Sequence, residues 1–421
     1  MHDFVFRKGE LYCESVPVQR IAEAVGTPVY IYSAHTILDH FWKLQRAFRT
    51  MKPVICFSVK ANSSAAILRL LQRAGSGFDV VSGGELYRAL SVGADPERIV
   101  FASVGKSNAE IAQALRAGIL CFNVESEPEL AAIEAVCRRL GRTARICLRL
   151  NPGIDPHTHR FIATGVPTSK FGLDPATVER LILDGDRYPH LVFSGIHLHI
   201  GSQITESKPF VQAVRVAAGI VTRLRRRGIR LRWLNLGGGL GIVYRNERPQ
   251  TAQRFAQTIL PVIRPLGLDL LLEPGRFIVG NAGLLVTRVL FLKETPRKRF
   301  LIVDAGMNDL IRPSLYDAYH EIAPVVTNGR SATKQLTDVV GPVCESGDFL
   351  AKDRPLPTVG AGELLGVFGA GAYGFVMSSN YNSRPRPAEV LVIGKQFHVI
   401  RRRERYQDLV RGEQMPEVLA S

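Results

Sequence analysis

The feature that most constrains the fold is a regular alternation of short apolar runs and amphipathic segments that begins near residue 53. Amphipathic stretches at 65–73, 84–92 and 127–140 separate neighbouring runs and have helical spacing. Strands that alternate with helices predict parallel βα units, and eight such units close a (β/α)8 barrel. Eight apolar runs precede residue 280, at 54–59, 77–81, 99–102, 119–124, 144–150, 191–199, 231–236 and 268–272.

An open, doubly wound sheet is the competing α/β architecture. Its first strand should lead into a glycine-rich G-x-G-x-x-G turn, where a dinucleotide binds. The corresponding turn here reads Ser58-Val59-Lys60-Ala61-Asn62 and has no glycine. We therefore predict a TIM-like barrel over residues 28–280.

The chain changes character after about residue 280. The later apolar runs, at 284–292, 299–303, 331–340, 363–368 and 388–393, are short and separated by Gly, Pro and Asn. This pattern indicates a mainly β domain. Residues 1–27 have a similar texture, so we assign 1–27 and 281–421 to one β-rich domain.

Composition narrows the compartment and the partners. No apolar run is long enough to span a bilayer, and the N-terminus lacks the basic-then-apolar layout of a secretory signal. The formal net charge is +16, densest at 223–232 and 401–405, but no nucleic-acid motif accompanies these runs. We interpret them as solvated basic surface that can steer anionic substrates, and we predict a cytoplasmic protein with no nucleic-acid or membrane partner.

The cysteines indicate neither a structural zinc site nor a dithiol motif, because no C-x-x-C pair is present. Cys56, Cys121 and Cys147 lie inside apolar runs and are expected to be buried. Cys344 differs, because it lies in a Gly-Pro-rich segment that ends Cys-Glu-Ser-Gly and reads as a loop. A buried structural role is therefore not expected for this thiol.

The barrel interpretation predicts functional residues at the C-terminal ends of the strands. Lys60 follows the first run, where a lysine in apolar surroundings can lose its proton and form a Schiff base. His197 and His199 end the sixth run and face the same side of it. They could be a metal pair or could stack on a flat cofactor; no matching set of further ligands is evident, so we predict no metal.

The last two runs supply further candidates. Gly237–Gly239 follow the seventh run, where glycines let backbone N–H groups approach a phosphate. Glu273 and Arg276 follow the eighth; the carboxylate could pair with a protonated ring nitrogen, although a salt bridge that closes the barrel is the alternative. A nucleophilic lysine, a stacking imidazole, a ring-nitrogen carboxylate and a phosphate loop on one rim indicate pyridoxal phosphate.

These residues lie in motifs that resemble those of the diaminopimelate decarboxylases, which are fold-type III pyridoxal-phosphate enzymes with alanine-racemase-like barrels. The resemblance runs nearly end to end. Its motifs are Phe57–Asn62, Phe78–Leu86, Thr168–Gly172, His197–Gln203, Gly237–Gly239, Glu273–Arg276, Ile311–Tyr316, Gly341–Asp348 and Gly371–Gly374.

The resemblance implies a role for each matched residue. Lys60 would bind pyridoxal 5'-phosphate covalently, His199 would stack on its ring, and Glu273 would pair with its nitrogen. Cys344 would donate a proton after decarboxylation. The phosphate would be held by Ser202, Gly238, Gly239 and Tyr373 with the backbone of Gly275 and Arg276 nearby, and the substrate by Arg276, Arg312, Tyr316, Glu345 and Tyr373.

The activity that the resemblance implies is decarboxylation of meso-2,6-diaminopimelate to L-lysine and CO2. In that family the Cys-Glu loop reaches into the barrel of a second subunit, which implies a homodimer with shared active sites. Close alternatives are decarboxylases of D-lysine, D-ornithine or a carrier-bound aminoacyl group. A non-enzymatic protein that binds pyridoxal phosphate would lack the second domain, and an alanine racemase would present a tyrosine base in place of Cys344.

Three charged residues at or just beyond strand ends have no unique assignment from the sequence. Asp79, Glu85 and Arg149 are candidates for a shell around Lys60 or the ring, and we count Asp79 among the cofactor contacts. Ordinary salt bridges are the alternative for all three.

Overall fold

The computed structural model describes residues 2–155, 164–165, 169–327 and 333–419. These residues form two compact units, one of residues 36–280 and one of residues 1–35 together with 281–421. The first is called the barrel unit below and the second the β unit.

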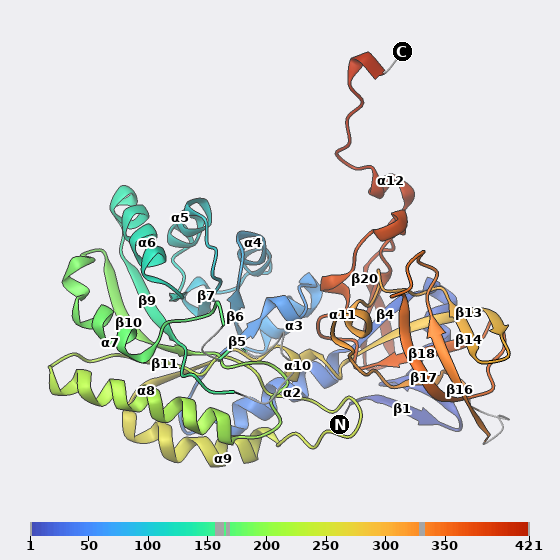
Figure 1. The fold of residues 1–421 in the computed structure, drawn as a ribbon, viewed down its shortest axis with the longest axis horizontal. Helices are drawn as coiled ribbons and strands as arrows, with labels where there is room; N and C mark the ends of the chain where they lie inside the picture. The colour runs from blue at the N-terminus through green and yellow to red at the C-terminus, as the bar shows by residue number, and fades with distance from the viewer. Residues whose placement is uncertain (1, 156–163, 166–168, 328–332, 420–421) are drawn as a thin grey trace. The chain divides into compact units, whose positions relative to one another are not determined.

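The barrel unit contains a closed parallel barrel, as predicted (Figure 1). Each strand lies within the run predicted for it and is up to three residues shorter, because the ends of several runs belong to the connecting turns. The barrel strands are β5 (Val54–Ser58), β6 (Gly77–Val80), β7 (Ile99–Phe101), β8 (Cys121–Val124), β9 (Ala144–Leu150), β10 (Leu191–Leu198), β11 (Trp233–Asn235) and β12 (Asp269–Leu272).

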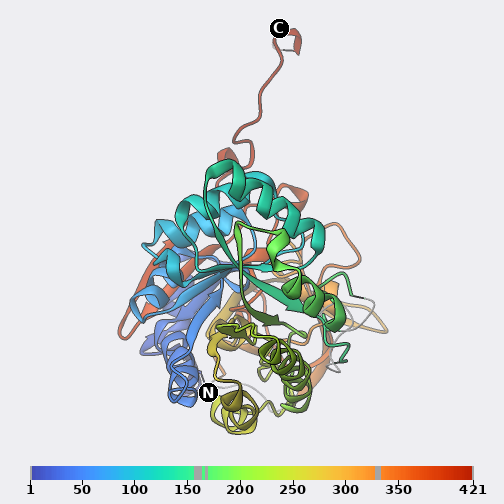
Figure 2. The same cartoon turned by 90° about the vertical axis from the view of Figure 1, so that its left-hand side faces the viewer.

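Helices surround the strands of this unit (Figure 2). The helix predicted at 127–140 is found with the same bounds: Ser126 accepts a hydrogen bond from the Glu129 N–H and begins α6, and Gly141 ends it in the left-handed region. The helices are α2 (Ala34–Ala47), α3 (Ala65–Arg73), α4 (Gly83–Ser91), α5 (Asn108–Ala117), α6 (Glu127–Leu140), α7 (Pro175–Leu183), α8 (Lys208–Arg226), α9 (Ala252–Ile263) and α10 (Arg276–Val279).

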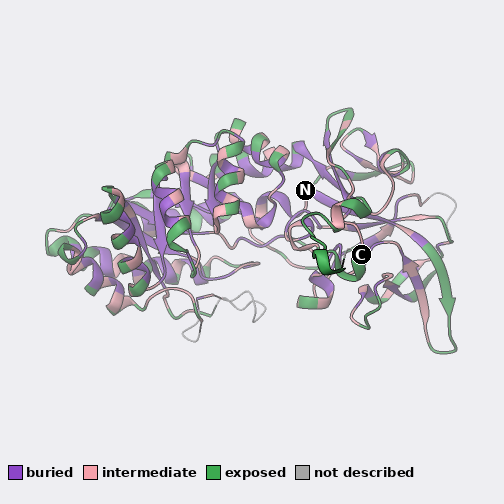
Figure 3. Ribbon diagram, turned by 90° about the horizontal axis from the view of Figure 1, so that it is seen from above, coloured by how far each residue is buried: buried purple, intermediate pink, exposed green. Residues whose placement is uncertain are grey.

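Burial follows this layering. In Figure 3 the barrel strands are buried, whereas the helices expose one face to solvent. The arginines at the end of α8 lie outside its apolar face, which agrees with a solvated basic surface. No helix among the described residues is long and apolar enough to cross a membrane.

The β unit is built on one large sheet in the order β17-β16-β14-β13-β4-β19-β20, and it also contains a small β1-β2-β3 sheet. Strand β18 also pairs with β13, and β15 pairs with β18. The run predicted at 331–340 is seen as a strand from Lys334; its first two residues lie outside the described residues. The strands are β1 (Phe4–Arg7), β2 (Glu10–Cys13), β3 (Val16–Pro17), β4 (Val29–Ser33), β13 (Gly283–Glu294), β14 (Arg299–Val303), β15 (Ile322–Pro324), β16 (Lys334–Val340), β17 (Phe349–Pro357), β18 (Leu364–Phe368), β19 (Ala388–Ile393) and β20 (Gln396–Arg401).

Two features of the N-terminal region differ from the expectation. Residues 18–25 form a helix, α1 (Val18–Val25), whose buried residues Val18, Ile21 and Ala22 recur at helical spacing. The division between the units falls at Thr36 instead of residue 28, because β4 pairs with β13 and β19 and is buried along its whole length. An apolar strand carries no local mark of which sheet it will join.

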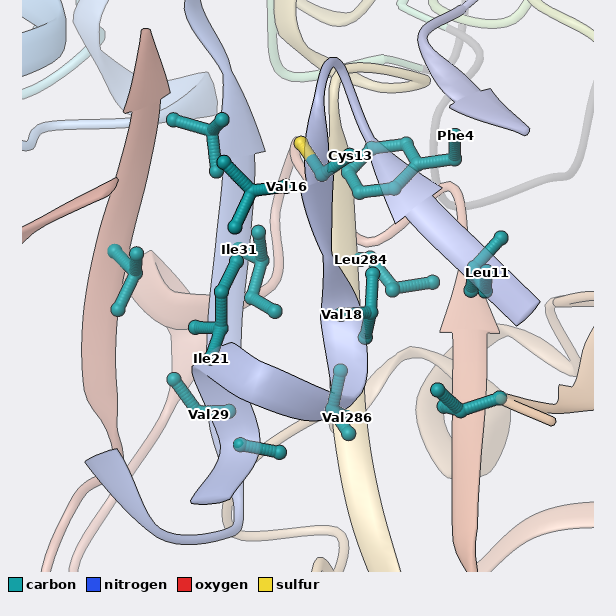
Figure 4. Close-up of a cluster of buried hydrophobic side chains, with 14 of the residues drawn as sticks. Phe4, Leu11, Cys13, Val16, Val18, Ile21, Val29, Ile31, Leu284 and Val286 are labelled. Carbon is teal, nitrogen blue, oxygen red and sulfur yellow. The ribbon is translucent and has the colours of Figure 1, made fainter. Parts of the chain in front are cut away.

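Phe4, Leu11 and Cys13 pack with Val16, Ile21 and residues of β4 and β13 in the core of the β unit (Figure 4). Burial of one such side chain contributes about 1.5–3 kcal/mol, so this cluster holds the N-terminal strands on the sheet. Short helices α11 (Arg312–Tyr316) and α12 (Tyr406–Leu409) lie outside the strands.

Candidate active site

Lys60 and Asp79 meet at the C-terminal ends of two neighbouring barrel strands. Lys60 lies in a short 3-10 turn, Val59–Ala61, directly after β5, and Asp79 lies in β6. Lys60 Nζ is 2.5 Å from Asp79 Oδ2, which also accepts a hydrogen bond of 2.7 Å from the Ser58 hydroxyl. Burial raises the pKa of Asp79, while the ammonium group of Lys60 opposes the rise.

The second carboxylate oxygen of Asp79, Oδ1, is not used by Lys60 or Ser58. Oδ1 is buried and has no hydrogen-bond partner among the described residues. A buried acceptor without a donor costs about 1–3 kcal/mol. The carboxylate therefore keeps an acceptor available for a further donor in the barrel.

Glu273 lies at the end of β12 and is 2 % exposed. Its Oε1 accepts hydrogen bonds from the side-chain amides of Asn123 (2.8 Å) and Asn235 (2.6 Å), and its Oε2 lies 3.1 Å from His197 Nε2. Burial raises the pKa of Glu273, but His197 and Lys60 lower it more, so the net pKa lies well below its usual value. A carboxylate that stays ionised in this interior can hold a cationic ring nitrogen.

The imidazole of His199 is neutral. Burial, Arg149 and Lys60 all lower its pKa well below the usual value. Its Nδ1 lies 3.2 Å from the Gly238 N–H and accepts that hydrogen bond, which places the ring proton on Nε2. A neutral, flat imidazole on the barrel rim is suited to stacking on an aromatic ring.

The glycines after β11 are required by close backbone contacts. A Cβ on Gly238 would lie 2.3 Å from the Glu273 carbonyl oxygen, and one on Gly239 would lie 2.6 Å from that of Gly201. Gly237 and Gly239 also have φ values of 65° and 111°, which favour glycine. The glycine loop thus lies directly against the chain that follows β10 and β12. A side chain on Gly238 or Gly239 would collide with that backbone.

Ser202 and Arg276 form the polar part of the same rim. Arg276 follows Gly275 at the start of α10 and is 7 % exposed. Its guanidinium contacts the Ser202 hydroxyl at 3.2 Å through Nη2, and its Nη1 donates to the Tyr244 hydroxyl at 2.7 Å. A buried guanidinium beside a hydroxyl is suited to binding an anion such as a phosphate or a carboxylate.

Glu85 and Arg149, which the sequence left without a role, both hydrogen-bond to backbone at the ends of barrel strands. Glu85 accepts a hydrogen bond of 2.9 Å from the Val81 N–H, and burial raises its pKa to about 7. Arg149 pairs with Glu125 at 2.7 Å and donates to the His199 carbonyl at 3.0 Å. Arg149 therefore fixes the backbone that carries the imidazole.

The β unit carries a second group of candidates. Arg312 is 6 % exposed, and its Nη1 lies 2.9 Å from His320 Nε2. An arginine can only donate, so His320 has its proton on Nδ1, which lies 2.8 Å from the Phe368 carbonyl. Tyr316 ends the same short helix, α11.

Cys344 and Glu345 lie on an exposed loop between β16 and β17. Cys344 is exposed, whereas the other cysteines, at positions 13, 56, 121, 137 and 147, are buried, as predicted for those inside apolar runs. The Cys344 N–H donates to Asn382 Oδ1 at 2.8 Å, and the Tyr381 hydroxyl lies 3.5 Å from Glu345 Oε2.

Tyr373 has a φ of 57°, in the left-handed region. That conformation is unfavourable by about 1–2 kcal/mol for a residue other than glycine and often marks a functional site.

Sequence reasoning missed His197, Asn123 and Asn235 as supports of Glu273, and His320 as the partner of Arg312. A signal for the two asparagines exists, because each is a polar amide inside an apolar run. A buried amide needs partners, so it indicates a polar cluster within a barrel. No group of three or more His, Cys, Asp or Glu side chains that could hold a metal is found in the described part of the chain.

The described residues fit pyridoxal phosphate. A lysine beside a carboxylate, a neutral imidazole and an ionised buried carboxylate correspond to its aldehyde carbon, ring face and ring nitrogen. The glycine loop, in which a Cβ would meet backbone, leaves room for a phosphate group beside Ser202 and Arg276.

Comparisons with known proteins agree with this fit. Residues 34–280 match the family model described as "Pyridoxal-dependent decarboxylase, pyridoxal binding domain". The chain is 48% identical over 415 residues to a diaminopimelate decarboxylase of Pseudomonas aeruginosa, covering 99% of each chain.

Two solved structures are also similar. Diaminopimelate decarboxylase from Helicobacter pylori, complexed with L-lysine, has a TM-score of 0.89 and 43% identity, covering 93% of this chain and 98% of that one. The enzyme from M. jannaschii, in co-complex with L-lysine, has a TM-score of 0.94 and 36% identity, covering 100% of both chains.

Proposed function

Because the chain belongs to the family of diaminopimelate decarboxylases, we propose that it converts meso-2,6-diaminopimelate to L-lysine and CO2, the last step of lysine biosynthesis. The observation that carries this proposal is the full-length identity of 48% to a diaminopimelate decarboxylase, over a site whose geometry fits the cofactor. The protein is a carboxy-lyase that uses pyridoxal phosphate.

When bound, pyridoxal phosphate supplies a sink for the electron pair that remains on the substrate as CO2 leaves. We propose that Lys60 binds it covalently, that His199 covers one ring face and that Glu273 holds the ring nitrogen. Its phosphate is assigned to Ser202, Gly238, Gly239, Gly275, Arg276 and Tyr373.

Lys60 must lose a proton before its amine can act as a nucleophile. Asp79 Oδ2 is the carboxylate oxygen at 2.5 Å from Nζ, and burial raises the pKa of Asp79. We assign Asp79 as the group that accepts and returns this proton. The hydroxyl of Ser58 donates to the same oxygen at 2.7 Å and helps to hold the carboxylate in place.

Diaminopimelate has an amino-acid group at each end, so the enzyme must react at one and hold the other. A carboxylate at the held end requires a cation, for which Arg276 and Arg312 are candidates, and an ammonium group requires an anion such as Glu345. Tyr316 and Tyr373 complete the proposed substrate contacts. Cys344, an exposed thiol on a loop, is proposed to deliver the proton to the α-carbon.

The proposal includes a homodimer in which the β unit of one subunit completes the barrel site of the other. We further assign the barrel unit and the β unit as the two functional domains. A cytoplasmic location is proposed because the cysteines are all free, which suits a reducing compartment.

The direct test is an assay of CO2 release by the purified holoenzyme with meso-diaminopimelate, D-lysine and D-ornithine in parallel. We expect turnover of diaminopimelate alone, with L-lysine as the product. Release from D-lysine or D-ornithine without release from diaminopimelate would assign the chain to another substrate. Bound cofactor with no release from any of the three would favour a protein that only binds pyridoxal phosphate.

A further inference from the structure

Asp348 lies where two loops of the β unit meet. It closes the loop that contains Cys344 and Glu345, and it is 5 % exposed. Its Oδ2 accepts a hydrogen bond of 2.6 Å from the Val343 N–H, one residue before Cys344. Its Oδ1 accepts another of 2.6 Å from the Met307 N–H, in the loop that leads from β14 to Arg312.

Glycines lie beside this carboxylate in both loops. A Cβ on Gly341 would lie 2.5 Å from Asp348 Oδ2, and one on Gly306 would lie 3.0 Å from Oδ1. At Gly341 the Cβ would also lie 2.5 Å from the Gly306 Cα, so glycine is needed there for the two loops to approach one carboxylate, and at Gly306 a Cβ would crowd it. The Gly341 N–H also donates to the Asp348 carbonyl at 3.2 Å, which closes the base of the Cys344 loop.

A second contact joins the same two segments. The Ser314 hydroxyl, on α11, donates to the Gly347 carbonyl at 2.5 Å. Helix α11 begins at Arg312, so the helix that carries the guanidinium is bonded to the loop that carries the thiol. Asp348 accepts one backbone N–H from each loop, on separate oxygens, whereas Ser314 contributes a single hydrogen bond. Asp348 is therefore the firmer of the two links.

We propose that Asp348 is a positioning residue that holds Cys344 and Arg312 at a fixed separation, so that the proton donor and the substrate's cationic anchor act on one bound molecule. The proposal rests on the roles given to Cys344 and Arg312 in the proposed function. Asp348 itself contacts backbone and takes no part in the proton transfer.

The test compares Asp348→Asn with Asp338→Asn. Asparagine keeps the shape but turns an N–H₂ group toward one of the two backbone donors. Asp338 is a matched control, because it is also 5 % exposed in the β unit and accepts a backbone N–H, that of Asp353, at 2.7 Å. The control measures what loss of any buried carboxylate does to this unit.

The first readout needs no catalysis. Cys344 is the cysteine that the single chain exposes. In the proposed dimer it lies at the shared site, so its alkylation by iodoacetamide in the holoenzyme, followed by peptide mass spectrometry, reports how readily its loop moves. We expect Asp348→Asn to raise that rate at least about threefold and Asp338→Asn to leave it unchanged. On diaminopimelate, kcat should fall about tenfold, or about 1.4 kcal/mol, with KM changed less than about threefold.

Equal alkylation rates and equal kcat in the two variants would overturn the proposal. If Asp348→Asn does not fold, Asn382→Ala decides, because it removes the acceptor of the Cys344 N–H at the exposed side of the loop. Its control is Asn380→Ala, since Asn380 bonds Glu404 instead. Faster alkylation in Asn382→Ala alone supports positioning of the loop, and no difference refutes it.

The alkylation comparison is independent of the substrate. An enzyme that does not release CO2 from diaminopimelate would refute the proposed function, whereas unchanged alkylation would refute the role of Asp348.

Discussion

At the scale of single residues, the site depends on a few buried charges whose partners set their protonation. Glu273 stays ionised because His197 and Lys60 lower its pKa, and His199 stays neutral because burial and Arg149 lower its own. Burial disfavours the charged form of both groups. The neighbouring charges decide the outcome: they keep Glu273 ionised and His199 neutral.

Lys60→Ala should abolish the visible absorption of the covalently bound cofactor and stop turnover, because no amine remains beside Asp79. The control is Lys395→Ala, which removes a lysine exposed in the turn between β19 and β20. Absorption spectra and CO2 release of the two variants check the prediction. A covalent cofactor band that persists in Lys60→Ala would mean that another lysine is used.

Asp309 gives a pH-dependent test in the β unit. Burial raises its pKa from 3.8 to about 7. Between these values the folded state keeps a proton that the unfolded state has lost, so this group lowers the free energy of unfolding as pH rises and its penalty is complete above about 7.

Asp309→Asn should therefore stabilise the protein at pH 8 relative to pH 5, by on the order of 2 kcal/mol. The amide oxygen can still accept the Gly306 N–H, which Asp309 Oδ2 accepts at 2.9 Å. Urea unfolding at both pH values measures the effect, with the exposed Glu413→Gln as control. The same gain at both pH values would contradict a titrating origin.

At the scale of elements, the rim is made by the ends of neighbouring strands. At the glycine loop these ends lie so close together that a side chain would not fit between them. Asn123 from β8, His197 from β10 and Asn235 from β11 converge on Glu273 after β12. The glycine loop after β11 then packs its backbone against the end of β12. The strand ends thus supply the polar side chains around Glu273, and the glycine loop supplies the space beside them.

Gly238→Ala should weaken cofactor binding about tenfold or more, because its Cβ would lie 2.3 Å from the Glu273 carbonyl oxygen and overpacking of this kind costs about 1–3 kcal/mol. Titration of the apoenzyme with pyridoxal phosphate, followed by fluorescence, measures the affinity. Gly105→Ala is the control, since a Cβ there meets nothing within 4 Å. Equal affinity in both variants would remove the glycine loop from the cofactor site.

At the scale of the whole molecule, the candidates are divided between two units. Lys60, His199 and Glu273 belong to the barrel unit, whereas Arg312 and Cys344 belong to the β unit. A barrel with a covalent cofactor accounts for amino-acid chemistry in general. In the proposed function, the proton donor Cys344 and every substrate contact except Arg276 belong to the β unit.

Mixing two inactive variants tests whether subunits share their sites. In a twofold dimer, random exchange of Lys60→Ala and Cys344→Ala chains makes half of the dimers mixed, each with one intact shared site, so about a quarter of wild-type activity should return. Each variant alone, treated in the same way, is the control. No recovery after demonstrated subunit exchange would place each site within a single chain.

The sequence by itself determined the barrel and the strand ends at which its candidate site residues lie. Strand periodicity and the alternation with helices are local properties, and strand ends locate Lys60, His199, Glu273 and the glycine loop without knowledge of any distant contact. Cys56, Cys121 and Cys147 are buried and Cys344 is exposed, as their local context predicts. The resemblance to a family added the roles.

Only the tertiary structure decided which residues support these groups. The amides of Asn123 and Asn235 reach Glu273 across 150 and 38 residues of chain, and β4 joins a sheet whose other strands begin at Gly283. The carboxylate of Asp348 likewise bonds a loop 41 residues away. Such pairings depend on how the chain closes on itself, and that closure leaves no periodic signal in the residues that it brings together.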